Sequence, residues 1–263
     1  MLCAAIVGAQ AQEQTRRNPR TESACRFEVL GSGKVASVLD GRSFMLEDGR
    51  EVRIAGIEVP AAQEPNHPNT AGAAAKAVLT SLLLGQAVEL HGLSLVRDRY
   101  GRTIAWVYRV GRAESAAHTM LGMGHARVAG HVGNAACAEE FLSRERVART
   151  AKLGLWADPR YEVREAGNGP QLLAALGHFT VAEGRVLSVR ESGGTIYLNF
   201  GRRWSEALTV TISKRQERVF SAAGIGPRRL EHRMVRVRGW IEQRNGPRIE
   251  ASRPEQIEVA GLN

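Results

Sequence analysis

The segment 38–61 constrains the fold of this chain more than any other stretch. Its residues 43–46 (Ser-Phe-Met-Leu) form a short apolar run that is typical of a β-strand. Asp48-Gly49 follows, and an Asp-Gly pair readily takes the positive φ angles of a type I′ turn. Apolar residues alternate again over 52–57, and Pro60 ends this return strand because proline has no N–H for the ladder. The segment therefore predicts a β-hairpin with a two-residue loop.

Two later segments extend this pattern. Asp-Arg-Tyr-Gly-Arg at 98–102 precedes an apolar strand over 103–108, and Gly-Leu-Trp at 154–156 follows a helix rich in Ala, Glu and Arg. Together with the hairpin, this order of motifs resembles the staphylococcal nuclease (thermonuclease) family over roughly residues 33–158. The resemblance implies an OB-type β-barrel and calcium-dependent cleavage of phosphodiesters.

The resemblance also implies roles for single residues. In the family, carboxylates hold a hard cation, a glutamate acts as general base on water, and two arginines clamp the phosphate. Both arginines are present, as Arg53 and Arg102, and these are the predicted phosphate clamp. The first aspartate of the family's DGDT motif corresponds to Asp40. This aspartate has a structural interpretation as well, because Asp before Gly commonly caps its own turn.

The other groups of the family's site are replaced. The second aspartate, a metal ligand, is Arg42, the third metal-binding carboxylate corresponds to Glu58, and the general base corresponds to Ala61. Calcium prefers roughly six to eight oxygen ligands, and a guanidinium cannot supply one. Loss of a positioned base typically costs about 10²–10⁴ in rate. We therefore expect no well-bound calcium and impaired cleavage, unless Glu64 replaces the missing base.

The arginines have two interpretations. They can converge on a phosphate, which guanidinium binds in a bidentate manner. They can equally be surface arginines of a basic chain. The motif context favours the phosphate clamp for Arg53 and Arg102 and leaves Arg42 open between the two.

Charge favours a polyanionic partner. The 263 residues hold 36 Lys and Arg against 27 Asp and Glu, a net charge of +9. Residues 178–263 alone hold 15 basic against 9 acidic residues, a net charge of +6. Such an excess is typical of proteins that bind nucleic acid or an anionic surface. Single-stranded DNA or RNA is the predicted partner.

The beginning of the chain predicts export. A short apolar run is followed by Ala9-Gln10-Ala11, an A-x-A cleavage pattern, so we interpret residues 1–11 as a signal peptide and expect a periplasmic or secreted protein. A frayed cytosolic N-terminus is the alternative. No later stretch approaches the ~18 apolar residues of a membrane span. Removal of the signal peptide would leave Cys25 and Cys137, which favours a disulfide over two unrelated thiols.

The domain organisation follows from composition and from an internal repeat. We expect a flexible arm over 12–25, a nuclease-like OB domain over 26–158, a linker over 159–177 and a second domain over 178–260. The second domain repeats the order strand, strand, strand, helix, strand, strand, which is that of an OB fold. The predicted fold class is mainly β with α: a nuclease-like OB barrel followed by a second, OB-like β-barrel.

Aromatic residues of the second domain point to two uses. OB barrels hold single-stranded nucleic acid with a basic groove and stacking aromatics. Trp204 lies in a turn beside arginines and is the contact candidate, whereas Tyr197, Phe200 and Trp240 are expected to fill the core. The residues assigned to nucleic-acid contact are Arg42, Arg99, Tyr100, Arg202, Arg203 and Trp204.

Three functions remain open at this point. The first is a nucleic-acid-binding protein of the nuclease fold without calcium-dependent cleavage. The second is an active exported phosphodiesterase that uses Arg53 and Arg102 with a rearranged metal site. The third is a non-catalytic envelope interaction module. The histidines at 118, 125 and 131 lack a carboxylate at ligand spacing, so we expect solvated or capping roles rather than a metal site.

Overall fold

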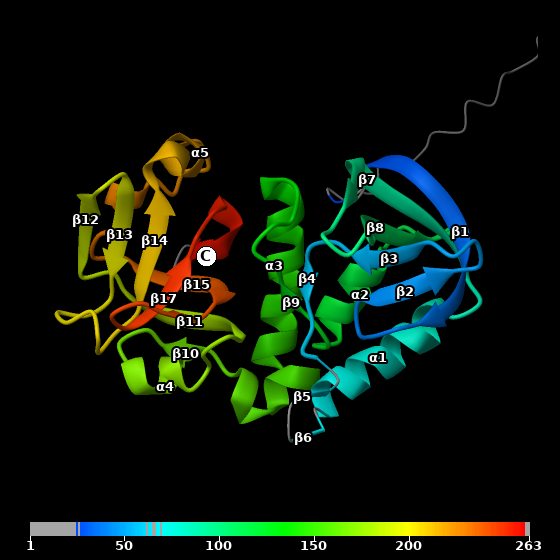
Figure 1. Cartoon of the computed structure of the whole chain (residues 1–263), viewed down its shortest axis with the longest axis horizontal. Coiled ribbons are helices and arrows are strands. Elements are labelled where there is room, and N and C mark those ends of the chain that lie inside the picture. Colours follow the sequence, from blue (N-terminus) through cyan, green and yellow to red (C-terminus); the bar gives the residue numbers. More distant parts are fainter. Residues whose placement is uncertain (1–24, 26, 62, 65–66, 69, 261–263) are drawn as a thin grey trace, which may run out of the picture.

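The computed structural model describes residues 25, 27–61, 63–64, 67–68 and 70–260. Two β-rich units lie on either side of helix α3 (Ala135–Thr150), as Figure 1 shows. The predicted signal peptide and residues 12–24 of the predicted arm lie outside the described residues. Among the described residues, no helix is both long enough and apolar enough to cross a bilayer.

The first unit is a closed five-stranded barrel in the order β1-β2-β3-β8-β7. Strands β3 and β8 are parallel, and the other neighbours are antiparallel. Apolar and polar residues alternate along the strands, so that one face of the sheet packs inside the barrel. On β3, Val52 and Ile54 are buried in the barrel, whereas Arg53 between them is not. The strands are β1 (Glu28–Val38), β2 (Ser43–Leu46), β3 (Glu51–Ile54), β7 (Ala87–Arg97) and β8 (Thr103–Arg109). The predicted nuclease-like OB barrel is confirmed.

The hairpin between β2 and β3 has a different loop from the predicted one. Gly49 has a φ of +83°, but Asp48 is not among the residues with positive φ, so the pair does not form a type I′ turn. The N–H of Gly49 instead donates to the carbonyl of Leu46 at 3.0 Å, and that of Leu46 donates to Arg50 at 2.9 Å. The carboxylate of Asp48 accepts the Arg50 N–H at 3.0 Å, which stabilises the three-residue loop.

Helices and short strands complete the first unit. Helix α2 begins after Ser115, whose side chain forms a capping box with His118, and α3 begins after Asn134, whose side chain caps Cys137. The remaining elements are α1 (Thr70–Leu83), α2 (Ala116–Gly122), β4 (Ile57–Glu58), β5 (Gln63–Glu64), β6 (His67–Pro68), β9 (Arg127–Val128), η1 (Gly154–Ala157) and η2 (Pro159–Tyr161).

The predicted disulfide between Cys25 and Cys137 is confirmed. Their Cα atoms lie 4.6 Å apart, and 112 residues separate them in the chain. Both side chains are fully buried. The bond ties the start of the described chain to the first turn of α3.

The second unit has two sheets and its own apolar core. The first sheet has the order β10-β11-β15-β18, and the second has the order β12-β13-β14-β17-β16. The strands are β10 (Arg164–Glu165), β11 (Phe179–Arg185), β12 (Ser188–Ser192), β13 (Thr195–Asn199), β14 (Thr209–Ser213), β15 (Met234–Trp240), β16 (Glu242–Gln243), β17 (Pro247–Glu250) and β18 (Ile257–Val259). The helices are α4 (Gly169–Leu173), η3 (Lys214–Gln216), α5 (Glu217–Ala222), η4 (Pro227–Leu230) and η5 (Pro254–Gln256).

A closed second barrel is not confirmed, although the strand pairing follows the OB order. The chain bends at 186–187, where the N–H of Val186 donates to the first sheet and that of Leu187 donates to the second. Strands β14 and β17 are parallel, as β3 and β8 are in the first unit. Strand β15 pairs with β11 and β18, and its continuation β16, rather than β15 itself, pairs with β17 across the turn at 244–246. The two sheets are therefore not joined into one closed ladder.

A buried charged network joins the two units. Arg238 of β15 donates to Glu145 of α3 at 2.9 Å and to the carbonyl of Val128 at 3.2 Å. Glu258 of β18 pairs with the same guanidinium, and neither Arg238 nor Glu145 has an exposed side chain. Buried charges are costly without their partners, so this network holds the second unit in one orientation against the first.

Candidate functional site

A cleft of about 530 Å³ lies between the two units. One wall comes from the first barrel and carries the arginine and carboxylate positions that the sequence singled out. The other wall comes from the second unit and carries an aromatic residue and further charges. The residues that matter below are Arg42, Arg53 and Glu58 on the first wall and Trp240, Glu242 and Arg253 on the second.

Strand geometry places Arg53 on the cleft. Its neighbours Val52 and Ile54 are 0% and 2% exposed and face the barrel core, so the side chain between them points outward. Arg53 is opposite Ser43 on β2 and Ile104 on β8, at the centre of the sheet. Arg53, one of the two arginines predicted to bind phosphate, therefore projects from β3 into the lining of the cleft.

Arg42 is committed to an ion pair inside the cleft. Its Nη1 donates to the Oε2 of Glu58 and, at 3.3 Å, to the carbonyl of Ile57. The two side chains are only 14% and 17% exposed. Burial raises the pKa of Glu58, and the positive charges of Arg42 and Arg127 oppose that rise. Arg42 thus neutralises the carboxylate that corresponds to a metal ligand.

Asp40 caps its own turn. One carboxylate oxygen accepts the backbone N–H of Arg42 at 2.7 Å. This is the structural role that an Asp-Gly pair indicates. With Asp40 turned to the backbone and Glu58 paired with a guanidinium, the donor set does not fit a calcium ion, which needs several oxygen ligands and tolerates no positive group among them.

Arg102 is held at the start of β8. Its Nε donates to Asp98 at 2.7 Å, and its Nη1 lies 3.8 Å from Glu51. Burial lowers the pKa of Arg102, but the hydrogen bond that Arg102 donates to Asp98 and the charges of Asp98, Glu51 and Asp40 raise the pKa overall. Arg102 and Arg53 therefore come from neighbouring strands, although Arg102 is not one of the residues that line the cleft.

The turn before β8 displays the other two predicted contacts of the first unit. The ring of Tyr100 is 66% exposed. The guanidinium carbons of Arg99 and Arg102 lie 4.8 Å and 5.0 Å from its centroid. This exposed ring with two cations near it combines an aromatic surface with positive charge.

The base position is filled by an alanine. Ala61 lines a second hollow of about 410 Å³, together with Glu58 and Trp240. Glu64 lies on β5, and its side chain is outside the described part of the chain. The suggestion that Glu64 replaces the base stays a prediction.

Trp240 is a residue that sequence reasoning misplaced. It was expected in the core, but it is 51% exposed and lines both hollows between the units. The alternation of β15 could have shown this, because Val235 and Val237 are buried and Trp240 falls on the opposite face. Phe200, at 5% exposure, is in the core as predicted.

Arg127 carried no signal in the sequence. It is buried on β9 beneath the second unit, 5.2 Å from the ring of Phe179 and 5.4 Å from that of Tyr161. Burial lowers its pKa to about 10, against the opposing charges of Glu145, Tyr161 and Glu58. Arg127 therefore packs against aromatic rings next to the cleft, and its positive charge interacts with Glu58 in the cleft wall.

The arginines predicted in the second unit are separated from the cleft. Arg202 is exposed, and Arg203 pairs with Glu206 at 2.9 Å. Trp204 is 62% exposed and lines a further hollow of about 370 Å³ on the five-stranded sheet. Tyr197, expected in the core, is half-buried and lines the same hollow.

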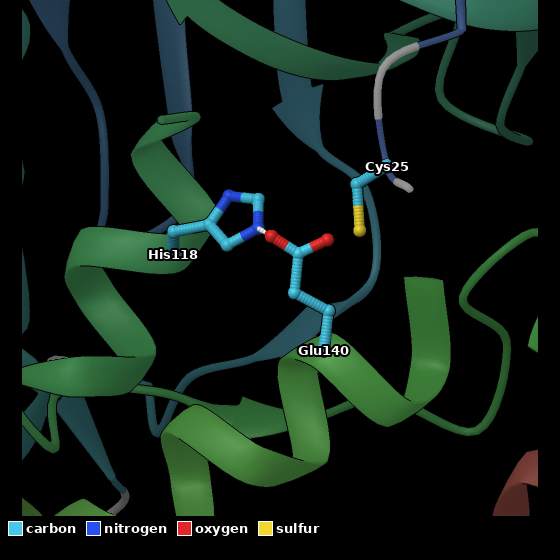
Figure 2. Close-up of side chains that lie close together, drawn as sticks. All are labelled: Cys25, His118 and Glu140. Atoms are coloured by element: carbon cyan, nitrogen blue, oxygen red, sulfur yellow. Dashed lines mark hydrogen bonds and ion pairs between the residues drawn. The ribbon is translucent and has the colours of Figure 1, made fainter. Parts of the chain in front are cut away.

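One other cluster has the residue types of a metal centre. The ligand atoms of Cys25, His118 and Glu140 lie within 4.8 Å of one another, and Figure 2 shows the imidazole of His118 in contact with the carboxylate of Glu140, with the sulfur of Cys25 nearby. The sulfur of Cys25 is bonded to Cys137, however, and a disulfide sulfur is not the thiolate that binds metals. The Nε2 of His118 lies 2.7 Å from Glu140, and its Nδ1 accepts the Ser115 N–H at 3.2 Å.

His118 therefore caps α2, which is one of the two roles expected for it. Its side chain is buried, however, and the spacing in the sequence did not indicate its carboxylate partner, Glu140. Burial lowers the pKa of His118, and the charge of Glu140 opposes that shift. The cluster strengthens the junction between α2 and α3.

Comparison with known proteins points to one family. The family described as Staphylococcal nuclease homologue matches residues 51–158, from β3 to the end of η1. A protein named Thermonuclease from Staphylococcus hyicus is 26% identical over 162 residues, which cover 60% of this chain and 95% of that protein. The family match falls on the first unit and its wall of the cleft.

Proposed function

We propose that this chain binds single-stranded DNA or RNA without calcium-dependent cleavage, from the premise that its first unit matches the staphylococcal nuclease family over residues 51–158. The observation that carries the proposal is the ion pair between Arg42 and Glu58. In this ion pair, the guanidinium of Arg42 occupies the carboxylate that would bind the calcium ion in the family's chemistry. The rest of the cleft keeps groups that bind phosphate.

Binding is supported by charge and by the positions of the arginines. Arg53 lies on the cleft, and Arg102 lies at the start of the neighbouring strand with its charged form favoured. Guanidinium groups bind phosphate oxygens in a bidentate manner, which suits a phosphodiester. The net charge of +9 would add non-specific attraction to the polyanion.

Loss of cleavage is supported by two substitutions that act together. Arg42 removes a metal ligand and occupies Glu58, so the Lewis acid has no adequate site. Ala61 has no group that could take a proton from water. Binding of the nucleic acid would then not lower the activation barrier of hydrolysis. No group activates the attacking water, and no metal stabilises the negative charge that develops on the phosphate.

Export is supported by the disulfide. Cys25 and Cys137 are bonded, and such bonds persist mainly in oxidising compartments. We therefore place the protein in the periplasm or outside the cell. Mass spectrometry of the mature protein from its native host would test this: the bond should be intact and the chain should begin after Ala11, whereas a reduced chain with residues 1–11 would contradict export.

The test combines binding and cleavage on purified mature protein. A fluorescent single-stranded oligonucleotide should bind, its affinity should fall steeply with added salt, and it should stay intact with calcium present. Arg53→Gln with Arg102→Gln should lose binding, whereas Arg112→Gln with Arg146→Gln, two arginines of the first unit outside the cleft, should not. Robust cleavage that a chelator abolishes would instead establish an active phosphodiesterase. Absence of salt-dependent binding would favour an envelope interaction module.

A further inference from the structure

The five-stranded sheet of the second unit has one polar face. On β13, Ile196 and Leu198 are buried in the core, so Tyr197 and Asn199 lie on the opposite face. On β14, Val210 and Ile212 are buried in the same way. An apolar core on one side and a hydroxyl-, amide- and guanidinium-bearing face on the other make this sheet available to a polar ligand.

Strand register brings the side chains of that face into two rows. In the first row, Tyr197 pairs with Arg190 on one side and with Thr211 on the other. In the second row, Thr209 pairs with Asn199 and with Arg248. These rows form the floor of the hollow of about 370 Å³ described above. An aromatic ring therefore lies between arginines that enter from β12 and β17.

Two loops form the rim of the hollow. Gly246 lies so close to the 201–206 loop that an added Cβ would be 1.9 Å from the carbonyl oxygen of Trp204. This close approach sets Trp204 beside the turn that carries Arg244 and Asn245, and all three line the hollow. Trp204 is 62% exposed, whereas tryptophan is on average largely buried in folded proteins.

The charges of the hollow are positive and largely unpaired. Arg190 and Arg244 are exposed, and neither takes part in the ion pairs that the described residues form. Arg248 pairs with Glu242, yet its Nε is buried and has no hydrogen-bond partner within the described chain.

The hollow adjoins the cleft between the units. Glu242 lines the cleft, Arg248 lines the hollow, and the two side chains form an ion pair. This ion pair is therefore the boundary between the two. A flexible polyanion that extends from the cleft into the hollow would pass this ion pair.

We propose that this hollow is a second subsite for the same single-stranded nucleic acid, an inference that rests on the proposed function. Trp204 and Tyr197 stack one or two bases, and Arg190, Arg244 and Arg248 contact the flanking phosphates. Aromatic stacking accepts every base, so the subsite holds the strand without reading its sequence. Guanidiniums on both sides of the rings favour an anionic strand over a neutral glycan, which aromatic rings alone would also accept.

The experiment uses the full mature chain and oligonucleotides of about 4 and about 16 nucleotides, the range of site sizes of OB folds. Trp204→Ala should weaken binding of the longer oligonucleotide about tenfold, the usual scale for one stacked base. Arg190→Gln with Arg244→Gln should lower the slope of log affinity against log salt by about 1.4, or about 0.7 per phosphate. The shorter oligonucleotide, able to occupy the cleft alone, should be affected less.

A matched control removes the same charge elsewhere. Arg215→Gln with Arg218→Gln, two exposed arginines of η3 and α5 outside the hollow, should leave the slope close to that of the parent protein. Trp204 and Trp240 are the two exposed tryptophans, because Trp106 and Trp156 are 7% and 3% exposed. The longer oligonucleotide should quench the tryptophan fluorescence of the parent protein, and Trp204→Phe should remove part of that quenching.

The outcomes separate this inference from the proposed function. If the Trp204 and Arg190/Arg244 variants bind like the parent while Arg53→Gln with Arg102→Gln loses binding, the subsite is wrong and the proposed function stands. If no oligonucleotide binds to the parent, both fail. Quenching of Trp204 by a neutral oligosaccharide but not by an oligonucleotide would overturn the subsite in favour of a glycan site.

Discussion

Arg238 of β15 and Glu145 of α3 form an ion pair of 2.9 Å in which neither side chain is exposed to solvent. The pair joins the second unit to the first, and Glu145 also accepts the N–H of Val128 at 2.6 Å. It lies beneath the cleft walls rather than in them. The distance across the cleft therefore depends on two buried charges that take no part in binding.

Glu145→Gln is expected to destabilise the protein by about 3 kcal/mol, the scale for breaking a buried pair from one side. The amide would leave Arg238 with Glu258 and would leave Arg149, 3.0 Å from Glu145, without its partner. Urea unfolding followed by tryptophan fluorescence measures the change. As a control, Glu206→Gln removes the exposed pair with Arg203 and should cost less than about 1 kcal/mol. Equal effects of the two variants would contradict the structural role of the buried pair.

The same carboxylate predicts acid sensitivity. Burial raises the pKa of Glu145, but the charge and hydrogen bonds of Arg238 outweigh burial, so the pKa is lowered from its ordinary value of 4.5. The unfolded chain then takes up the proton first as pH falls, and the stability that Glu145 contributes is lost below pH 4.5. The difference in unfolding free energy between the parent and Glu145→Gln should be constant from about pH 7 to 5 and shrink below pH 4.5. If this difference in unfolding free energy grew as the pH falls below 4.5, the lowered pKa of Glu145 would be contradicted.

Reduction of the disulfide is expected to destabilise the first unit. The bond closes a segment of 112 residues, for which the chain-entropy estimate is about 5 kcal/mol. Differential scanning calorimetry with and without reductant should show a lower Tm for the reduced protein. The double variant Cys25→Ser with Cys137→Ser should unfold at that lower Tm with or without reductant. If its Tm matches that of the oxidised parent, the bond contributes nothing.

Restoring the two replaced groups tests how far the cleft has diverged. Arg42→Asp would release Glu58 and supply a carboxylate, so calcium should bind, as measured by calorimetric titration. Cleavage of single-stranded DNA should need Ala61→Glu in addition, with a gain of about 10²–10⁴ over Arg42→Asp alone. The single variant Ala61→Glu is the control and should stay inactive. A double variant that binds calcium but does not cleave would mean that other parts of the cleft have changed as well.

Local patterns were sufficient for the strands of the first unit, although not for the turn type at Asp48-Gly49. The alternation over 52–57 predicted the return strand, and the DRYGR motif was followed by the predicted strand. The OB order of the second unit was predicted in the same way, because strand, helix and turn signals depend on neighbours in the chain. Whether the two sheets close into one barrel did not follow from them: β18 pairs with the second edge of β15, and only the continuation β16 pairs with β17.

By itself the sequence determined the barrel, its family motifs, and the absence of an acid at position 42 and of a base at position 61. Only the tertiary structure decided that Arg42 pairs with Glu58, that Trp240 faces the cleft, and that Arg238 meets Glu145 across 93 residues of chain. The reason is physical. Periodicity encodes which face of an element is apolar, but the partner of a buried charge is set by which surfaces two folded units bring together.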